Sequence, residues 1–377
     1  MGKIINEVKN FIRLIINRKL LSNVNKSSHS KKVLVSYITS PFLHDLQNHT
    51  NVLEGRVIAK IFDKIGYSVD VINYDSSRII DYSKYSVIFG FGEPFESSFA
   101  SQAQLVRIYY ATGAHVVHQN LAEINRVIDV NKKRHTSLLP SRVVPWNWSL
   151  SVSLSDALIV IGNTWTLSTY KKYSDAPMYS INATALTNNS LSRVIEDKER
   201  KKRSFLWFGS RGSIHKGLDL CVELFKMRPD LVLHICGPKE DDFFEIFNCE
   251  LESENIHFHG FVDVKSEKFV EIVSKCSFSV LPTCSEGQAT SLLTTMGRGL
   301  IPISTIYSGV DVDKHGYLIE RLSTSSLEES INNAISLTQD EITEKAKEIN
   351  NYINQCHSIP AFEDKLDFIL RDILSEI

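Results

Sequence analysis

The sequence predicts an α/β protein of two domains, each built around a parallel β-sheet. Short apolar strands alternate with amphipathic helical segments along most of the chain, which is the βαβ rhythm of parallel sheets. A length of 377 residues is too great for one ordinary hydrophobic core. The charged run EDKERKKR at 196–203 interrupts the apolar rhythm and marks a linker, which we place at 191–203.

Residues 1–22 are expected to form a basic amphipathic helix. Isoleucine, valine and phenylalanine fall on one helical face, lysine and arginine surround it, and Glu7 is the one acidic residue. An uninterrupted apolar core and a small-residue cleavage site are both missing, which argues against a signal peptide. We interpret residues 1–30 as this helix and a polar tether, with the helix lying on an anionic membrane face. The alternative is a helix packed on its own domain or on a partner.

The first domain is expected at residues 31–190. Strands are predicted at 33–38, 68–74, 86–91, 156–163 and 179–182, and a helix is predicted at 51–65. The stretch 125–142, rich in lysine, arginine and asparagine, is interpreted as an insertion or loop with a solvated face. Ligands of parallel sheets lie beyond the carboxyl ends of the strands.

A glycine-bearing loop at 209–217 is the first candidate site of the second half. It follows the apolar run 205–208 and precedes a helical pattern that starts at Leu218. The loop carries Arg211 and Lys216. A guanidinium fork and an ammonium point charge on such a loop are suited to a diphosphate.

The stretch 281–302 is the second candidate site. A buried strand at 276–281 leads to Glu286 and Gly287, which precede a helix at 289–296. The first turn of such a helix presents free N–H groups that suit phosphate, and Glu286 can accept hydrogen bonds from hydroxyls. Together these features indicate a sugar phosphate. The alternative is an ordinary βα turn, in which Glu286 complements the helix dipole.

These motifs, in this order, resemble the nucleotide-binding domain of family-4-like (group 1) glycosyltransferases of the GT-B fold. Gly209, Arg211 and Lys216 correspond to the family's G-R-x4-K-G element, which contacts the donor diphosphate. Glu286 corresponds to the first Glu of the family's E-x7-E element, which meets hydroxyls of the donor sugar. The chain has Thr294 where the family's second Glu holds the ribose.

The resemblance implies two Rossmann-like domains whose parallel sheets face a central cleft. The second domain is then expected at 204–357, and a C-terminal helix at 358–377 that crosses back to the first. The expected donor-binding residues are Gly209, Ser210, Arg211, Lys216, Gly237, Phe261, Val262, Glu286, Gly287, Gln288, Ala289, Thr290 and Thr294.

His115 completes the expected catalytic set with Arg211, Lys216 and Glu286. It follows a strand in a stretch that resembles the family's loop bearing a histidine near the donor sugar. A neutral imidazole there would orient a donor hydroxyl. The alternative is that His115 or His118 is a hydrogen-bonded structural histidine.

The resemblance implies a hexosyltransferase that moves a sugar from a nucleotide diphosphate sugar to a hydroxyl of a glycan or lipid-linked acceptor. Retention of anomeric configuration and independence of metal and cofactor are implied with it. Two alternatives stay open: a non-catalytic partner subunit that lost ribose affinity through Thr294, and a sugar-nucleotide epimerase of the same fold. The basic N-terminus favours a peripheral membrane enzyme of bacterial O-antigen or capsule assembly.

The composition indicates which class of protein this is and in which cellular compartment it is expected. A formal net charge of −2 and a pI near 6.6 give no indication of a nucleic-acid-binding protein. The six cysteines include no C-x-x-C pair, so we expect free thiols in a reducing cytoplasm. Together with the basic N-terminus, this gives an expected location at the inner face of the cytoplasmic membrane. Cysteine and histidine show no metal-ligand spacing along the chain.

Overall fold

The computed structural model describes residues 19–43, 50–186 and 201–375. The predicted N-terminal amphipathic helix therefore lies almost entirely outside the described residues, as does most of the predicted linker. Within the described ranges, no helix has the length and apolar character needed to cross a membrane.

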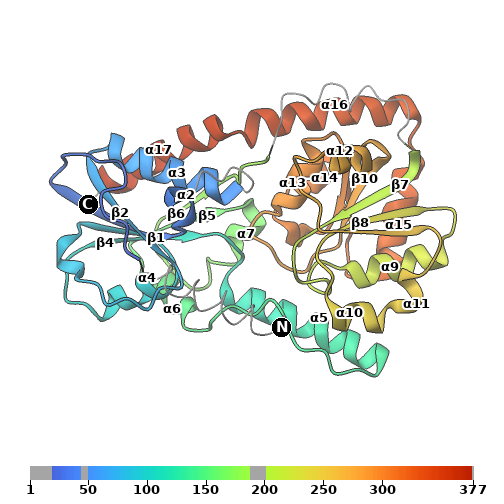
Figure 1. Ribbon diagram of the computed structural model, residues 1–377, viewed down its shortest axis with the longest axis horizontal. Coiled ribbons are helices and arrows are strands. Elements are labelled where there is room, and N and C mark those ends of the chain that lie inside the picture. Colours follow the sequence, from blue (N-terminus) through green and yellow to red (C-terminus); the bar gives the residue numbers. More distant parts are fainter. Residues whose placement is uncertain (1–18, 44–49, 187–200, 376–377) are drawn as a thin grey trace.

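Two six-stranded parallel sheets form the two halves of the molecule, which confirms the predicted fold class (Figure 1). In the first sheet the spatial order is β2-β1-β3-β4-β5-β6, and in the second it is β12-β11-β10-β7-β8-β9. The strands of the first sheet are β1 (Lys31–Tyr37), β2 (Tyr67–Asn73), β3 (Val87–Gly90), β4 (Val106–Ala111), β5 (Ala157–Ile161) and β6 (Met178–Ile181). Those of the second are β7 (Lys201–Phe208), β8 (Val232–Cys236), β9 (Ile256–Gly260), β10 (Cys276–Leu281), β11 (Ile301–Ser304) and β12 (Tyr317–Leu318).

Helices connect and cover these strands. The helices of the first half are α2 (Ser40–Leu43), α3 (Thr50–Lys64), α4 (Glu93–Ser97), α5 (Val116–Arg134), α6 (Trp148–Leu154) and α7 (Thr164–Ser168). Those that follow β7 are α9 (Leu218–Met227), α10 (Asp241–Ile246), α11 (Asn248–Leu251), α12 (Glu267–Ser274), α13 (Thr290–Met296), α14 (Val312–His315), α15 (Thr324–Ile335), α16 (Gln339–Cys356) and α17 (Ile359–Ser375).

The described part of the segment predicted as an N-terminal helix and polar tether, residues 19–30, is bound to the first sheet and is not a free tether. The backbone N–H of Leu21 donates to Val71 O at 2.9 Å, and that of Asn23 donates to a carboxylate oxygen of Asp70 at 2.8 Å. Because β2 is an edge strand, the backbone bonds of Leu21 with Val71 and of Val24 with Val69 cover groups that would otherwise face solvent.

The stretch predicted as an insertion or loop at 125–142 is helical as far as Arg134, so that interpretation is wrong for its first part. It belongs to α5, which extends from the first half toward α10 and α11 of the second (Figure 1). Three of the cations that suggested a solvated face, Arg126, Lys133 and Arg134, are paired instead with acidic side chains of the second half. Arg126 contacts Asp219 at 2.6 Å, and Arg134 contacts Glu223 at 2.7 Å. A helix in this position ties the two halves together.

The last two helices run along one side of both halves (Figure 1). α16 packs on the second half, against α13 and β11, and α17 packs on the first, against α3 and β6. Ion pairs fasten α17 to α3, with Lys60 at 2.6 Å from Glu363 and Lys64 at 3.2 Å from Asp367. β7 begins at Lys201, inside the stretch predicted as a linker.

Candidate active site

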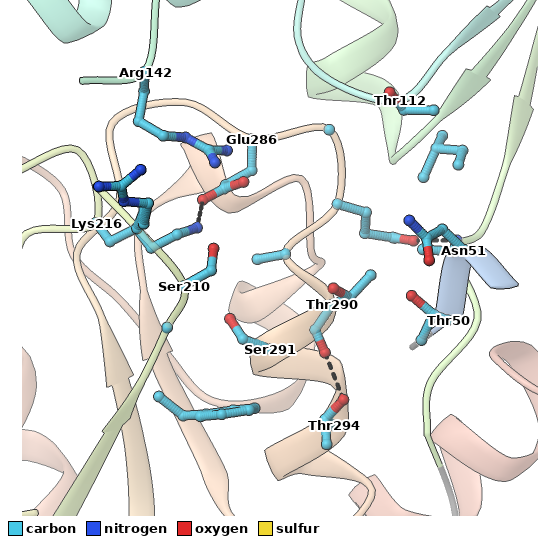
Figure 2. Close-up of a pocket in the computed structure, with 18 of the residues that line it drawn as sticks. Thr50, Asn51, Thr112, Arg142, Ser210, Lys216, Glu286, Thr290, Ser291 and Thr294 are labelled. Carbon is cyan, nitrogen blue, oxygen red and sulfur yellow. Dashed lines mark hydrogen bonds and ion pairs between the residues drawn. The ribbon is translucent and has the colours of Figure 1, made fainter. Parts of the chain in front are cut away.

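A cleft of about 920 Å³ lies between the two halves, lined by residues of both. It forms where loops at the carboxyl ends of the strands meet, as expected for parallel sheets. Figure 2 shows Arg142, Lys216 and Glu286 on one side of it, and Thr50, Asn51 and Thr112 on the other. All thirteen expected donor-binding residues line it.

Lys216 and Glu286 form a buried ion pair in the cleft wall (Figure 2). The ammonium of Lys216 contacts Oε1 of Glu286, and the two side chains are 5% and 12% exposed. The hydroxyl of Thr283 donates to the same oxygen at 3.3 Å. Burial by itself raises the pKa of Glu286, but the positive charges of Lys216, His215 and Arg142 lower it to about 2. Glu286 is therefore an ionised acceptor across the physiological pH range.

Two glycines fix the loop that carries Lys216. Gly217 has φ +68°, and a Cβ there would lie 2.2 Å from the carbonyl oxygen of Pro282, so no other residue fits. Gly209 lies against the ring of Trp207, where a Cβ would approach within 2.7 Å. The Trp207 indole N–H donates to Lys216 O at 3.2 Å, which fixes the backbone beneath the ammonium group.

Two arginines add positive charge near this ion pair. Arg211 is exposed, lines the cleft and forms no ion pair with any residue of the described ranges. Arg142 enters from the first half, from the loop that follows α5, and lies beside Glu286 in Figure 2. Glu123 on α5 holds that loop, because its Oε1 accepts the backbone N–H groups of Ser141 at 2.7 Å and of Arg142 at 3.1 Å.

Sequence reasoning missed Arg142 as a site residue. In the sequence, Arg142 stands out only as one cation of a basic stretch. The direction of its side chain depends on the helical register of α5 and on the fold of the loop that follows.

The first turn of α13 opens onto the cleft. Its N-cap residue, Ala289, provides no side-chain acceptor, and Thr290 and Ser291 line the cleft beside it. Thr294 lies one turn further along the helix (Figure 2). Its hydroxyl donates to the Thr290 carbonyl oxygen at 2.7 Å, so Thr294 presents an oxygen with its hydrogen already engaged.

Gly287 and Gln288 line the cleft and also join the two halves. The Thr166 hydroxyl donates to Gly287 O at 2.6 Å, and a Cβ on Gly287 would lie 2.6 Å from the Thr112 carbonyl oxygen. The side-chain oxygen of Gln288 accepts the backbone N–H of Ala183 at 2.7 Å. The segment after Glu286 thus fixes the relative position of the halves.

Gly237, Phe261 and Val262 also line the cleft. Phe261 is 83% exposed, whereas Val262 is buried. An aromatic ring that is open to the cleft can stack on a planar ligand group.

His115 does not line the cleft, and its geometry favours the structural alternative. The side chain is fully buried, caps α5 by accepting the Val117 N–H at 3.3 Å, and stacks on Tyr173 at a centroid distance of 3.8 Å. Burial and the neighbouring His118 lower the pKa of His115 to about 4, so the ring is neutral. Thr112, at the end of β4, faces the cleft instead.

Glu54 on α3 is a second acidic residue of the cleft, which sequence reasoning also missed. It is 3% exposed and accepts the backbone N–H and the hydroxyl of Thr184 at 3.0 and 2.9 Å. Burial raises the pKa of this carboxyl, while the bonds from Thr184 oppose the rise. Glu54 lies in a segment that was predicted only as a helix of the first domain, and it belongs to no recognisable motif. Only the tertiary structure therefore shows that it faces the cleft.

Comparison with known proteins finds a family match for the second half of the chain. Residues 193–355 match the family described as glycosyl transferases group 1. They span the loop of Lys216, the segment of Glu286 and the second sheet. Among curated proteins no significant match is found.

Solved structures share the whole two-sheet architecture. TarM of S. aureus, in complex with Fondaparinux, alpha-GlcNAc-glycerol and UDP, has a TM-score of 0.54 at 13% identity over 84% of this chain. The chain spans 58% of the length of that protein. The sucrose-phosphate synthase of Thermosynechococcus elongatus has a TM-score of 0.64 at 11% identity, covering 92% of this chain and 100% of its own. WaaG, a glycosyltransferase involved in lipopolysaccharide biosynthesis, has a TM-score of 0.57 at 14% identity, covering 89% and 98%. At these identities the likeness shows the fold.

Proposed function

We propose that the chain is a group 1 glycosyltransferase, because residues 193–355 match that family and the chain has the GT-B fold. It transfers a sugar from a nucleotide diphosphate sugar to a hydroxyl of a glycan or lipid-linked acceptor, with retention of anomeric configuration. The observation that carries this proposal is the buried Lys216–Glu286 pair at the edge of a cleft with further cations around it.

The second half holds the donor in this proposal. Lys216 and Arg211 neutralise the diphosphate, and Arg142 adds a third positive charge from the opposite half. These charges are fixed before the substrate binds, so they stabilise the departing diphosphate without reorganisation. Because cationic side chains supply this charge, the proposed reaction uses no metal ion and no cofactor. The UDP bound to TarM supports a nucleoside diphosphate as the leaving group.

Glu286 orients the donor sugar. It is held ionised by Lys216, and a carboxylate accepts hydrogen bonds from two sugar hydroxyls at once. Fixing the sugar in this way exposes the anomeric carbon to the acceptor across the cleft. Phe261 is placed to stack on the base, and Thr294 contacts the ribose through its free lone pair.

The first half holds the acceptor. Its side of the cleft combines the carboxyl of Glu54 with Thr50 and Asn51, and with the rings of Tyr74 and Trp148. Carboxyl, hydroxyl and amide groups beside aromatic faces suit the alternating polar and apolar surfaces of a sugar. We assign the acceptor side to residues 31–190 and the donor side to residues 204–357.

The setting proposed is bacterial surface-polysaccharide assembly at the inner face of the cytoplasmic membrane. The basic amphipathic sequence of residues 1–22 supports attachment to an anionic membrane surface. The role of WaaG in lipopolysaccharide biosynthesis supports a lipid-linked glycan as acceptor. Flotation of the full chain with anionic vesicles, compared with a chain lacking residues 1–25, tests the attachment. Equal partitioning of the two would contradict it.

A nucleotide-release assay tests the transfer. The purified chain is incubated with common nucleotide sugars and an extract of lipid-linked glycans, and donor consumption and glycosylated product are both measured. Arg211→Ala and Glu286→Gln should each lower transfer by about 10²–10³. Arg203→Ala is the matched control, because Arg203 is also an exposed arginine of the second half but pairs with Asp230 outside the cleft. Transfer at the wild-type rate in both cleft variants would remove the proposal.

Thr294 favours one second candidate, a non-catalytic partner subunit of the same fold. Without the family's second glutamate the ribose contact is weaker, and such a subunit would bind no nucleotide. Calorimetric titration with a panel of nucleoside diphosphates separates the two candidates. Binding that Arg211→Ala abolishes supports the enzyme, and the absence of any binding supports the subunit.

A further inference from the structure

Three side chains that are remote in sequence meet behind the cleft wall. They are Glu123 on α5, His215 in the loop before α9 and Cys284 after β10, all of them buried. Their carboxylate oxygen, ring nitrogen and sulfur lie within 4.8 Å of one another. His215 Nδ1 is 2.9 Å from Glu123 Oε2 and 3.4 Å from Cys284 Sγ. None of the three lines the cleft, so the proposed transfer reaction does not account for them.

The hydrogen bonds around the cluster leave its three facing atoms to contact one another. His215 Nε2 lies against the Ser285 carbonyl oxygen, which can only accept, so a ring hydrogen is on Nε2. Without a metal, a second ring hydrogen on Nδ1 pairs His215 with Glu123, whose other oxygen already accepts two backbone N–H groups. A metal ion can take the place of that second hydrogen, and Nδ1 then presents a lone pair to it beside the Glu123 carboxylate and the Cys284 sulfur.

We propose that this cluster is a zinc site. Zinc takes nitrogen, oxygen and sulfur ligands at about 2.0, 2.1 and 2.3 Å, which in a tetrahedron separates nitrogen from sulfur by about 3.5 Å and nitrogen from oxygen by about 3.3 Å. The 3.4 Å between His215 Nδ1 and the Cys284 sulfur already matches, and the 2.9 Å between Nδ1 and Glu123 Oε2 needs to lengthen by about 0.4 Å. Zn²⁺ with one carboxylate, one thiolate and a neutral imidazole is electrically neutral, which suits a buried position. Water takes the fourth position.

The surroundings of the cluster fit a metal site. Histidine ligands of zinc usually donate their other ring N–H to a carbonyl or carboxylate, as His215 does to Ser285. Ligating carboxylates are themselves hydrogen-bonded, as Glu123 is by the Ser141 and Arg142 backbones. The ligands are 92 and 69 residues apart along the chain, so no local spacing signals them.

The position of this site gives it a structural role in the cleft. His215 directly precedes Lys216, Cys284 lies two residues before Glu286, and Glu123 holds the loop of Arg142. One zinc ion would therefore fix three segments that each carry a charged residue of the cleft. The ion itself remains behind the wall and does not touch the substrate.

Elemental analysis tests the site independently of any transfer activity. The full chain is purified without a histidine tag, dialysed against metal-free buffer and analysed by inductively coupled plasma mass spectrometry. About one zinc per chain is expected in the wild type. Cys284→Ala should lose the metal, whereas Cys221→Ala, which removes an equally buried cysteine of α9, should retain it. Circular dichroism shows whether both variants are folded.

Cobalt substitution gives a second readout. Co²⁺ in the wild type should show the visible absorption of a tetrahedral site with a thiolate ligand, and Glu123→Gln, which keeps an acceptor for the two backbone N–H groups, should bind Co²⁺ more weakly. Metal-free wild type that takes up neither zinc nor cobalt would overturn the proposal and indicate a doubly protonated His215 paired with Glu123. Retention of zinc by Cys284→Ala would also overturn it.

Discussion

Replacing Lys216 by methionine removes one charge from a buried pair and leaves the length of the side chain nearly unchanged. In the wild type the Lys216 ammonium contacts the carboxylate of Glu286, and both groups are almost entirely shielded from solvent. The variant keeps a buried carboxylate that has lost its direct ion-pair partner, and the remaining positive charges, on His215 and Arg142, act on it more weakly than Lys216 does. Burial then dominates, and the pKa of Glu286 rises from about 2 toward or above its ordinary 4.5.

The size of the effect follows from that shift. A difference of about 2.5 pKa units corresponds to about 3 kcal/mol, which agrees with the roughly 3–5 kcal/mol lost when one partner of a buried pair is removed. We expect Lys216→Met to lower the free energy of unfolding by about 3 kcal/mol at pH 7. The double variant Lys216→Met/Glu286→Gln should recover most of this loss, because it leaves no unpaired charge.

The pH dependence has a definite sign. The pKa of Glu286 is lower in the folded protein than in the unfolded chain, so its ionisation stabilises the fold above about pH 4.5. This contribution is lost as the pH falls from about 4.5 toward 2. The difference in stability between the wild type and Lys216→Met should therefore shrink across that range.

Urea denaturation followed by tryptophan fluorescence measures the stabilities, and nucleotide release measures transfer. Transfer should fall by about 10²–10³ in the single variant and stay low in the double variant, because both lack the Lys216 ammonium that neutralises the leaving diphosphate. A single variant as stable as the wild type at pH 7 would refute the reasoning about the ion pair. Recovery of transfer in the double variant would refute the catalytic role of Lys216.

Three further substitutions probe the cleft and its frame. Gly287→Ala should lower transfer at least about tenfold, and it should increase the radius of gyration in small-angle scattering, because its Cβ would lie 2.6 Å from Thr112 O and push the halves apart. Gly113→Ala is the control and should change neither quantity, since its Cβ meets nothing closer than 3.8 Å. Phe261→Ala should weaken nucleoside diphosphate binding by about 1–3 kcal/mol in calorimetry without changing thermal stability, since the ring is 83% exposed; unchanged affinity would exclude stacking. His115→Asn, which retains a helix N-cap, should keep transfer near the wild-type rate, and a loss of transfer in a stable His115→Asn protein would restore the catalytic interpretation.

Local patterns in the sequence were enough to predict the parallel α/β architecture. Apolar runs such as 33–38 and 276–281 became β1 and β10 within two residues, because a strand buried on both faces consists mostly of apolar residues. The glycine loop that carries Lys216 and the turn that carries Glu286 were also visible. Each is a short-range motif in which glycine spacing and a following helix fix the backbone.

The interpretation of basic residues was wrong where their ion-pair partners are distant in the sequence. The basic stretch 125–142 was interpreted as an insertion or loop, yet it continues α5 as far as Arg134, and Arg126 and Arg134 pair with acids about 90 residues away. Nothing local distinguishes a lysine or arginine that meets solvent from one that meets a carboxylate of another domain. His115 was left open for the same reason, since the stacking of Tyr173 on its ring is a tertiary contact.

The sequence by itself determined the two parallel sheets, and it identified Lys216 and Glu286 as polar groups at their carboxyl ends. Only the tertiary structure decided that Arg142 and Glu54 face the same cleft, that His115 caps a helix, and that Glu123, His215 and Cys284 meet. Strand and helix periodicities are encoded over a few neighbouring residues, so they can be read along the chain. The convergence of side chains from opposite halves depends on how two sheets dock, and no pattern along the chain records that arrangement.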